Sequence, residues 1–273
     1  MEEVRTSLSI VIPVYRAGNY IENLIRRIYE TKDLLNKSGI KLLEIICVCD
    51  EPVDDSLEVI TSLKSKYSLI KIIELSANLG QHLATSAGII ATCGEWICTI
   101  DEDLQHDPIF LMDLFINATK YSYDLVYAKS KGLIHRRSFY RDYLSKLSKL
   151  IISLITGLNI NITSSYRLIR GPIARSSATC MDKFQYLDNL LFYLTSKRRR
   201  SSSYLDFYDK RKNKMSGYNF KKLLSLFFKT FYSSEVGATR FFLILFIPLS
   251  LISIIISFFL IFWSYTLDAT TNN

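Results

Sequence analysis

Strand-like and helix-like segments alternate along residues 7–100, and this alternation limits the possible folds more than any other feature of the chain. Short apolar, β-prone runs occur at residues 7–15, 42–49, 70–75 and 96–100, and another follows at residues 123–128. Stretches of helical character lie between the first four, at residues 18–35, 56–67 and 81–93. Strands and helices that alternate at this pitch form parallel βαβ units, and such sheets bind ligands at the carboxyl ends of their strands. The sequence therefore predicts an α/β fold with a mostly parallel sheet.

An acidic cluster follows the fourth strand, in the stretch TIDEDLQHDP at residues 99–108. Carboxylates this close together repel one another unless a cation lies between them. A solvated turn that leads into a helix explains Asp107 as an N-cap and Pro108 as the first helical residue, but leaves Asp101 and Asp103 unexplained. One or two carboxylates can hold a hard divalent ion while its other positions stay open for phosphate oxygens. If the chain turns directly after the strand, Asp101 and Asp103 can both reach one Mg²⁺ or Mn²⁺ ion, and the rest of the chain has to decide between such a site and a solvated turn.

Several other chemistries lack their sequence signals. No G-x-G-x-x-G or Walker lysine motif follows any strand, which removes the main support for a dinucleotide site or a P-loop. The five cysteines are an odd number without a paired C-x-x-C spacing, which favours reduced, buried thiols in a cytosolic compartment over disulfides or zinc. The N-terminal stretch MEEVRTS has no apolar core, so we expect no signal peptide.

Positive charge is concentrated in one region of the chain. The formal net charge is +8, and residues 197–222 hold ten Lys or Arg residues against only Asp206 and Asp209. This imbalance predicts an anionic partner that binds locally, and we do not expect that partner to be a nucleic acid. His135 adds to a basic stretch elsewhere, whereas we expect His82 to be structural and His106 to be an exposed loop residue.

Residues 241–265 carry no formal charge and are almost continuously apolar. A helix of this length spans about 37 Å, compared with roughly 30 Å for the hydrocarbon core of a bilayer. A buried core helix is the alternative, but so long an apolar run favours a single transmembrane helix. Basic residues precede the run, and the tail at 266–273 carries only Asp268, so the positive-inside rule predicts that the N-terminal bulk faces the cytoplasm.

Two basic amphipathic segments precede the apolar run, at residues 138–158 and 219–233. Either segment alone is typical of ordinary core packing, but two of them beside a membrane span favour helices that lie at the membrane interface. We therefore expect a globular domain at residues 1–215, a juxtamembrane amphipathic segment at 216–240, a transmembrane helix at 241–265 and a short tail at 266–273.

Four stretches carry a resemblance to a known family: SIVIPVY, EIICVCDEPVDDS, NLGQHLATSAGIIATCGEWICTIDEDLQHDP and RKNKMSGY. In this order they resemble glycosyltransferase family 2, and within it the polyprenyl-phosphate glycosyltransferases, such as dolichyl-phosphate mannose synthase and bacterial undecaprenyl-phosphate sugar transferases. The resemblance covers roughly residues 7–240. It implies a Rossmann-like, nucleotide-sugar-binding domain of the GT-A type, a metal-dependent inverting reaction and a membrane partner. A homo-oligomer is left open.

The resemblance also implies roles for individual residues. The catalytic set is Asp101, Asp103, Arg167 and Arg211, of which Asp101 and Asp103 bind the metal. The nucleotide-binding set is Pro13, Tyr15, Asp50, Asp54, Asn78, Gly80, Gln81 and Asp101. The set around the acceptor phosphate is Arg136, Arg137, Arg211, Lys214 and Ser216, with Arg167 as a further cation. Cys49 and Glu51-Pro52 depart from the common Asp and Gly-Ser of the base-binding turn, so the base contacts are expected to differ.

One departure bears on the acceptor. In the stretch SSYRL, Ser165 stands where the family often has an aspartate near the reacting sugar, while Arg167 is retained. A polyprenyl phosphate is already ionised and needs no general base, whereas an alcohol does. We therefore expect a hexose to pass from a UDP- or GDP-sugar to undecaprenyl or dolichyl phosphate. A hydroxyl acceptor on a lipid-linked glycan and a catalytically idle scaffold that only binds nucleotide sugar are the alternatives.

Overall fold

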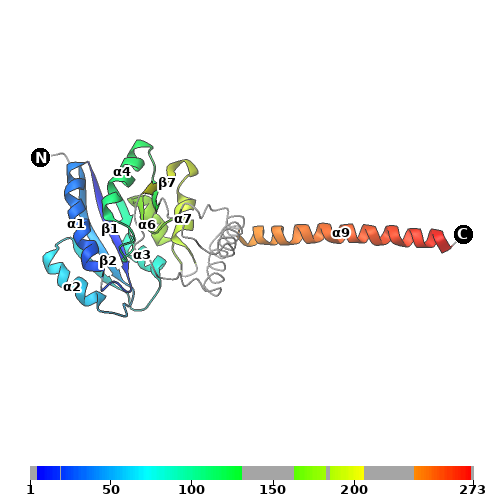
Figure 1. The fold of residues 1–273 in the computed structure, drawn as a ribbon, viewed down its shortest axis with the longest axis horizontal. Helices are drawn as coiled ribbons and strands as arrows, with labels where there is room; N and C mark the ends of the chain where they lie inside the picture. Colours follow the sequence, from blue (N-terminus) through cyan, green and yellow to red (C-terminus); the bar gives the residue numbers. More distant parts are fainter. Residues whose placement is uncertain (1–4, 19, 131–162, 183–184, 206–236, 272–273) are drawn as a thin grey trace.

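A seven-stranded sheet forms the centre of the computed structural model, which describes residues 5–18, 20–130, 163–182, 185–205 and 237–271 (Figure 1). The strands are β1 (Thr6–Val14), β2 (Ile40–Cys49), β3 (Ile70–Glu74), β4 (Trp96–Thr99), β5 (Leu125–Ser130), β6 (Arg167–Arg170) and β7 (Arg200–Leu205). They lie in the order β3-β2-β1-β4-β6-β5-β7. Only β6 runs antiparallel to its neighbours β4 and β5. The predicted α/β fold with a mostly parallel sheet is thus confirmed.

Helices cover both faces of the sheet. Three pack on one face: α1 (Ile21–Lys37), α2 (Ser56–Lys66) and α4 (Leu111–Lys120). Three pack on the other face: α3 (Gln81–Ile90), α6 (Gly171–Thr179) and α7 (Leu187–Leu194). Two short 3-10 turns, η1 (Pro108–Phe110) and η3 (Lys197–Arg199), complete the domain. Because alternate residues of a strand face opposite sides, the continuous apolar runs of β1 and β2 supply both layers of the core.

Helix α3 packs closely on the sheet and is shorter than the sequence suggests. A Cβ atom on Gly88 would lie 2.4 Å from a methyl carbon of Val11, so glycine permits the close approach of helix and strand. We expected the helix to reach residue 93, but it ends at Ile90. Beyond its last turn the amides bind other partners: the N–H of Cys93 donates to Glu44, and that of Gly94 donates to the Ser9 hydroxyl.

The sequence analysis predicted no element between residues 163 and 205, where the structure has β6, α6, α7 and β7. Strand β6 has only four residues, and α7 has eight, so neither presents a long periodic pattern. The antiparallel β6 inserts between β4 and β5, and so brings the SSYRL stretch to the carboxyl end of β4.

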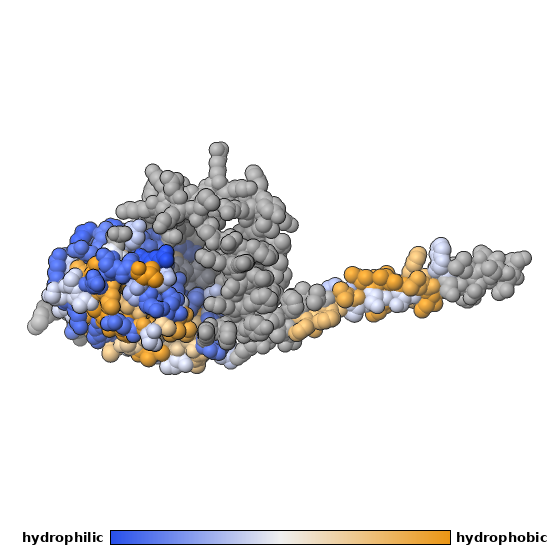
Figure 2. Space-filling model, turned by 90° about the horizontal axis from the view of Figure 1, so that it is seen from below, coloured by the Kyte–Doolittle hydropathy of each residue, from blue (hydrophilic) through white to orange (hydrophobic). Residues whose placement is uncertain are grey.

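The last described element is helix α9 (Gly237–Thr271), which extends away from the domain in Figure 1. Its segment Phe246–Trp263 is long and apolar enough to cross a membrane, and none of it is buried within the molecule. Figure 2 shows apolar side chains along this helix, in contrast to the mainly polar face of the domain in the same view. The hydroxyls of Ser250 and Ser257 donate to carbonyls of their own helix, as a lipid environment requires. The helix thus fits the expected single transmembrane helix, and its exposure contradicts the buried-core alternative.

The two amphipathic segments predicted at 138–158 and 219–233 lie outside the described residues. The expected boundary at residue 215 also lies outside the described residues. The expected boundary at residue 240 falls inside helix α9, which begins at Gly237. The division between juxtamembrane segment and membrane helix is therefore not marked by a break in this helix.

Candidate active site

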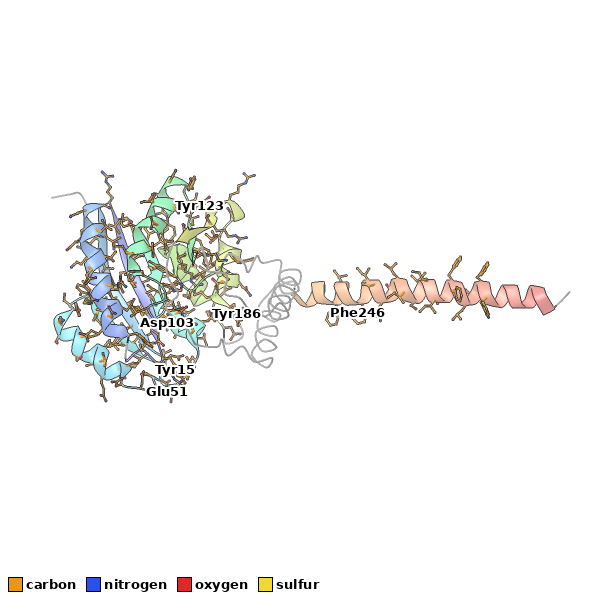
Figure 3. The ribbon with its side chains drawn as sticks, in the orientation of Figure 1. Tyr15, Glu51, Asp103, Tyr123, Tyr186 and Phe246 are labelled. Carbon is orange, nitrogen blue, oxygen red and sulfur yellow. The ribbon has the colours of Figure 1, made fainter. Side chains whose placement is uncertain are left out.

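A pocket of about 200 Å³ opens at the carboxyl ends of β1 and β4. The strand order reverses at this place, which is where open α/β sheets bind their ligands. The residues that line it come from the ends of β1 and β4 and from the starts of α3, β6 and α7: Pro13, Gln81, His82, Thr85, Thr99, Ile100, Asp101, Thr163, Ser164, Ser165, Arg167 and Asp188. Figure 3 shows Tyr15 and Asp103 at this end of the sheet and Tyr123 at the opposite end.

Asp101 is a half-buried carboxylate of the pocket lining. The side-chain amide of Gln81 donates to its Oδ1, and the hydroxyl of Ser165 donates to its Oδ2. Burial raises the pKa of Asp101, and the nearby charge of Asp103 adds to this effect. The Ser165 hydroxyl and the positive charge of Arg167 lower the pKa but do not cancel the increase. A carboxylate in this environment gains stability when a cation binds beside it.

Asp103 lies in the turn that follows β4. The strand ends at Thr99, and Leu104 has a left-handed backbone with φ of 58°, so the chain turns as expected. The carboxylate of Asp103 accepts hydrogen bonds from the Gln105 main-chain and side-chain amides, at 3.1 and 3.0 Å. The side chain of Leu104 packs against the core beneath the turn, which anchors the loop. Asp103 itself is not part of the pocket lining.

The donor set fits a hard divalent ion that also binds phosphate. Within the part of the chain that the structure describes, no group of three His, Cys, Asp or Glu side chains is arranged to hold a metal by itself. Mg²⁺ needs only one or two protein carboxylates where substrate phosphates complete its shell. Asp101 and Asp103 supply such oxygens, and the desolvation of Asp101 favours a nearby cation. These two residues would hold the ion.

The two carboxylates expected to contact the nucleotide base, Asp50 and Asp54, accept hydrogen bonds from main-chain amides. Asp50 is buried, and its two oxygens accept from the N–H groups of Leu79 and Gly80, at 2.7 and 2.8 Å. The side-chain amide of Asn78 donates to the carbonyl oxygen of Asp50. Asp50 and Asn78 therefore tie the loop before α3 to the end of β2, and Gly80, with φ of 88°, makes the turn into that helix.

Asp54 similarly connects the β2–α2 turn with the loop after β1. Its carboxylate accepts from the amides of Gly18 and Ser56, at 3.3 and 3.2 Å, and from the Ser56 hydroxyl. Burial raises the pKa of Asp54, but these hydrogen bonds outweigh burial, so the pKa lies below its ordinary value. Both base-binding candidates therefore shape the edge of the site.

The end of β1 contributes Pro13 and Tyr15. Pro13 lines the pocket, whereas the Tyr15 side chain is 36% exposed beside it, with the Arg16 guanidinium 5.3 Å from its ring centroid. The N–H of Tyr15 donates to Glu102, the residue between Asp101 and Asp103. The sequence analysis gave Glu102 no role beyond its part in the acidic cluster.

Arg167 is almost completely buried at the pocket wall. Its Nη1 pairs with Asp188, and its Nε donates to the Thr99 hydroxyl at 3.1 Å. The Tyr127 hydroxyl donates to the same Asp188 oxygen at 2.8 Å. Burial opposes the charge of Arg167, but Asp188 outweighs it and raises the pKa of the guanidinium. Sequence reasoning missed Asp188, whose only signal is an isolated acid in the apolar stretch YLDNLLF.

The histidines differ from expectation in one respect. His82 lines the pocket and packs edge-on against Tyr186, with ring centroids 4.4 Å apart. His106 is half-buried against Tyr166, so the prediction of an exposed loop residue was wrong. The loop folds onto Tyr166, whose hydroxyl donates to the Asp107 carbonyl. Asp107 is the N-cap of η1, with Pro108 as its first residue, as predicted.

The remaining predicted residues lie outside the described ranges. They are Arg136, Arg137, Arg211, Lys214 and Ser216, the set expected around the acceptor phosphate. The structure therefore brings together Pro13, Gln81, Asp101 and Arg167 in the pocket, and Tyr15, Asp50, Asp54, Asn78, Gly80 and Asp103 in the loops of the same sheet edge.

Residues 9–171, more than half of the chain, match the family model described as glycosyl transferase family 2. The chain belongs to this family. Membership confirms the resemblance drawn from the four sequence stretches. It also accounts for the acidic turn after β4 lying at the strand-order reversal of a GT-A type α/β fold.

Three curated relatives illustrate the relationship. An uncharacterized glycosyltransferase of Bacillus subtilis, YkcC, is 28% identical over 222 residues, which are 80% of this chain and 65% of the relative. The undecaprenyl-phosphate 4-deoxy-4-formamido-L-arabinose transferase of Salmonella choleraesuis is 28% identical over 224 residues, which are 81% of this chain and 65% of that protein. A Synechocystis glycosyltransferase is matched over 57% of its length. The chain thus spans less than two thirds of these relatives.

Solved structures support the fold. Staphylococcus aureus TarS in complex with UDP has a TM-score of 0.54 at 16% identity, over 86% of this chain and 68% of the other. Glucosyl-3-phosphoglycerate synthase from Mycobacterium tuberculosis, with Mn²⁺ and UDP-glucose, has a TM-score of 0.55 at 16% identity, over 82% of this chain and 76% of the other. At this identity the likeness establishes the GT-A type fold.

Proposed function

We propose that this protein transfers a hexose from a nucleotide diphosphate sugar to a polyprenyl phosphate at the membrane surface. The observation that carries the proposal is the placement of Asp101: it lies half-buried in the pocket at the strand-order reversal, between Gln81 and Ser165. The Salmonella relative is named as an undecaprenyl-phosphate transferase, which supports this class of acceptor. The sugar of that relative is a modified arabinose, so the sugar itself is a matter for experiment.

We infer metal dependence from the hydrogen-bond partners of the main-chain amides at this end of the sheet. Main-chain amides at a sheet edge often bind phosphate. Here the amides of residues 15–18 and 78–80 donate instead to side chains of the same chain: Glu102, Ser56, Asp54, Glu51 and Asp50. Those seven donors are therefore not available to a diphosphate. We infer that a divalent ion at Asp101 and Asp103 offsets its charge.

The chemistry requires little of the protein beyond binding and orientation. When bound, the ion would act as a Lewis acid for the departing diphosphate. Gln81 and Ser165 orient the Asp101 carboxylate, and the buried charge of Arg167 is fixed by Asp188 and Thr99 at the pocket wall. An oxygen of the acceptor phosphate forms a bond to the anomeric carbon as the bond from that carbon to the diphosphate oxygen breaks. The configuration inverts, and no proton moves.

The acceptor assignment rests on Ser165. The side chain at this position is a hydroxyl group that donates a hydrogen bond to Asp101, so it supplies no general base. One observation favours the hydroxyl-acceptor alternative: Asp188 is a carboxylate that lines the same pocket. Its Oδ1, however, accepts from both Arg167 and Tyr127, and this pairing stabilises a fixed counter-charge more than a proton acceptor.

Location at the membrane is part of the same proposal. Helix α9 provides the single span, and the Lys and Arg bias before it supports a cytoplasmic domain made of residues 1–215. Arg136, Arg137, Arg211, Lys214 and Ser216 are proposed to surround the acceptor phosphate, since arginine forks match phosphate oxygens.

Acceptor selectivity tests the proposal. The full chain in detergent is given polyprenyl phosphate or the matching polyprenol, and Arg211→Ala is compared with Ser165→Ala. Loss of one charge-assisted contact to phosphate should cost about 1.5–3 kcal/mol, or roughly ten- to a hundredfold in kcat/KM, for Arg211→Ala. Ser165→Ala should have a much smaller effect. Equal use of the neutral alcohol, or a greater loss in Ser165→Ala, would replace the phosphate acceptor with a hydroxyl acceptor.

A further inference from the structure

The middle residue of the D-x-D stretch makes contacts unlike those of its two neighbours. Glu102 does not line the pocket. Its Oε2 accepts a hydrogen bond from the N–H of Tyr15 at 2.7 Å, and its Oε1 accepts from the N–H of Arg16 at 3.0 Å. The carboxylate therefore connects the loop after β4 to the loop after β1, across 86 and 87 positions of sequence.

This connection completes the anchoring of the acidic loop. Asp101 is tied to α3 through Gln81 and to the start of β6 through Ser165. Asp103 accepts hydrogen bonds from the Gln105 amides of its own turn. Glu102 is thus the described side chain of this loop that fastens it to β1, the strand whose end carries Pro13 and Tyr15.

We propose that Glu102 is a positioning residue, which clamps the loop of Asp101 and Asp103 to the end of β1 and so holds the metal and nucleotide sites in one arrangement. The proposal rests on the proposed function for its ligands. It gives Glu102 the part of a support for the metal ligands and not of a third ligand, because both of its oxygens accept from main-chain N–H groups of the β1 loop. Side chains that orient metal ligands commonly contribute about 10- to 100-fold to metal affinity or activity when replaced.

The chemistry of the clamp makes glutamine the informative replacement. Two consecutive N–H groups match the two oxygens of a carboxylate, whereas an amide would direct its NH₂ group at one of these donors. Glu102→Gln keeps the volume and removes one acceptor and the charge. Glu102→Asp keeps the charge but is one methylene shorter than the span requires.

Glu95 supplies a matched control in the same pair of strands. Glu95 directly precedes β4, whereas Glu102 lies in the loop after this strand. The Glu95 carboxylate accepts a hydrogen bond from the Thr6 hydroxyl at the start of β1, at 2.6 Å. Glu95→Gln is therefore the same chemical change on the same strand pair, at the opposite end of the sheet. It leaves the pocket and its loops untouched.

The experiment measures binding and turnover separately. UDP with MnCl₂, and GDP with MnCl₂ in parallel, are titrated into the full chain in detergent by calorimetry, and free Mn²⁺ is followed by electron paramagnetic resonance. For Glu102→Gln we expect the nucleotide and Mn²⁺ affinities to fall about 10- to 100-fold, with donor KM rising in step and kcat at saturation little changed. Glu95→Gln should match the wild type. Thermal melting confirms that each variant is folded, and Glu102→Asp is used if Glu102→Gln does not fold.

Several results would overturn the proposal. These are wild-type affinities in Glu102→Gln, a fall in kcat with unchanged KM and binding, equal losses in Glu95→Gln, or failure of both Glu102 variants to fold, which would assign the residue to the fold alone. A wild-type chain that binds neither nucleotide with Mn²⁺ would overturn it as well. If the wild type binds nucleotide but transfers no sugar to a lipid phosphate, the proposed function fails, and the binding data still decide the role of Glu102.

Discussion

Removing the Asp188 carboxylate should destabilise the domain much more than breaking an exposed ion pair of the same chemistry. In the wild type, Asp188 accepts from Arg167 and Tyr127, two side chains that are almost completely buried. Asp188→Ala leaves a buried guanidinium without its counter-charge and a buried hydroxyl without its acceptor. The Arg199–Asp124 pair provides the comparison, because the Arg199 side chain is 48% exposed.

The two pairs differ in expected magnitude. Breaking a buried ion pair by removing one partner typically costs about 3–5 kcal/mol. The Asp188 side chain is 18% exposed at the pocket, so we take the lower end, about 3 kcal/mol, as the loss in the free energy of unfolding for Asp188→Ala. An exposed pair contributes little to stability, so Arg199→Ala should cost much less than Asp188→Ala.

Urea unfolding of the full chain in detergent measures both losses. Fluorescence of Trp96, a buried residue of β4 whose ring contacts Phe115, reports on the domain. A Trp263→Phe background removes the signal of the membrane helix. The midpoint and the slope are fitted together, so that a change in the slope reveals a departure from two-state unfolding. A loss in Asp188→Ala no larger than that in Arg199→Ala would refute the view that the Arg167–Asp188 pair is desolvated.

Three further predictions concern the metal, the pH dependence and the topology. Asp103→Ala should abolish transfer with the fold retained, because one fewer carboxylate holds the ion; activity within a few-fold of wild type at saturating Mn²⁺ would contradict the metal role. Burial raises the pKa of Glu44, but hydrogen bonds from Lys71, Ser9 and the Cys93 amide outweigh it, so the folded pKa lies below 4.5. The stabilisation is therefore present above pH 4.5 and lost as pH falls through the folded pKa, and the difference in urea midpoint between wild type and Glu44→Gln should shrink below that pH. Protease added outside sealed cells should spare residues 1–235, and digestion of that region would reverse the proposed topology.

Local patterns predicted much of the fold. The alternation up to residue 128, the N-cap at Asp107 and the apolar helix at the C-terminus are all short-range signals, and each agrees with the structure. The elements from 163 to 205 were missed, because short strands and helices carry no sustained period. The antiparallel insertion of β6 depends on pairing with β4, more than sixty positions away, which no local pattern encodes.

The candidate site was likewise predicted only in part from the sequence. The acidic turn and its neighbours could be placed at one sheet edge from motif order alone. The contacts of the individual carboxylates could not, because Asp50, Asp54 and Glu102 accept from amides of other loops. An acidic residue that binds a ligand and one that binds a main-chain N–H look alike in a sequence. Asp188 was missed for a related reason, since its partners Arg167 and Tyr127 lie on different strands.

The central claim is a metal-dependent transfer of sugar to a lipid phosphate, and a donor panel tests it most directly. The purified full chain is incubated with radiolabelled UDP- and GDP-sugars, Mn²⁺ and undecaprenyl or dolichyl phosphate, and the organic phase is counted with and without EDTA. We predict that one donor gives a labelled lipid and an equal amount of nucleoside diphosphate, that EDTA abolishes this product, and that Asp101→Asn does not form it. Label that stays in the aqueous phase for every donor, or a lipid product that survives both EDTA and Asp101→Asn, would contradict the claim.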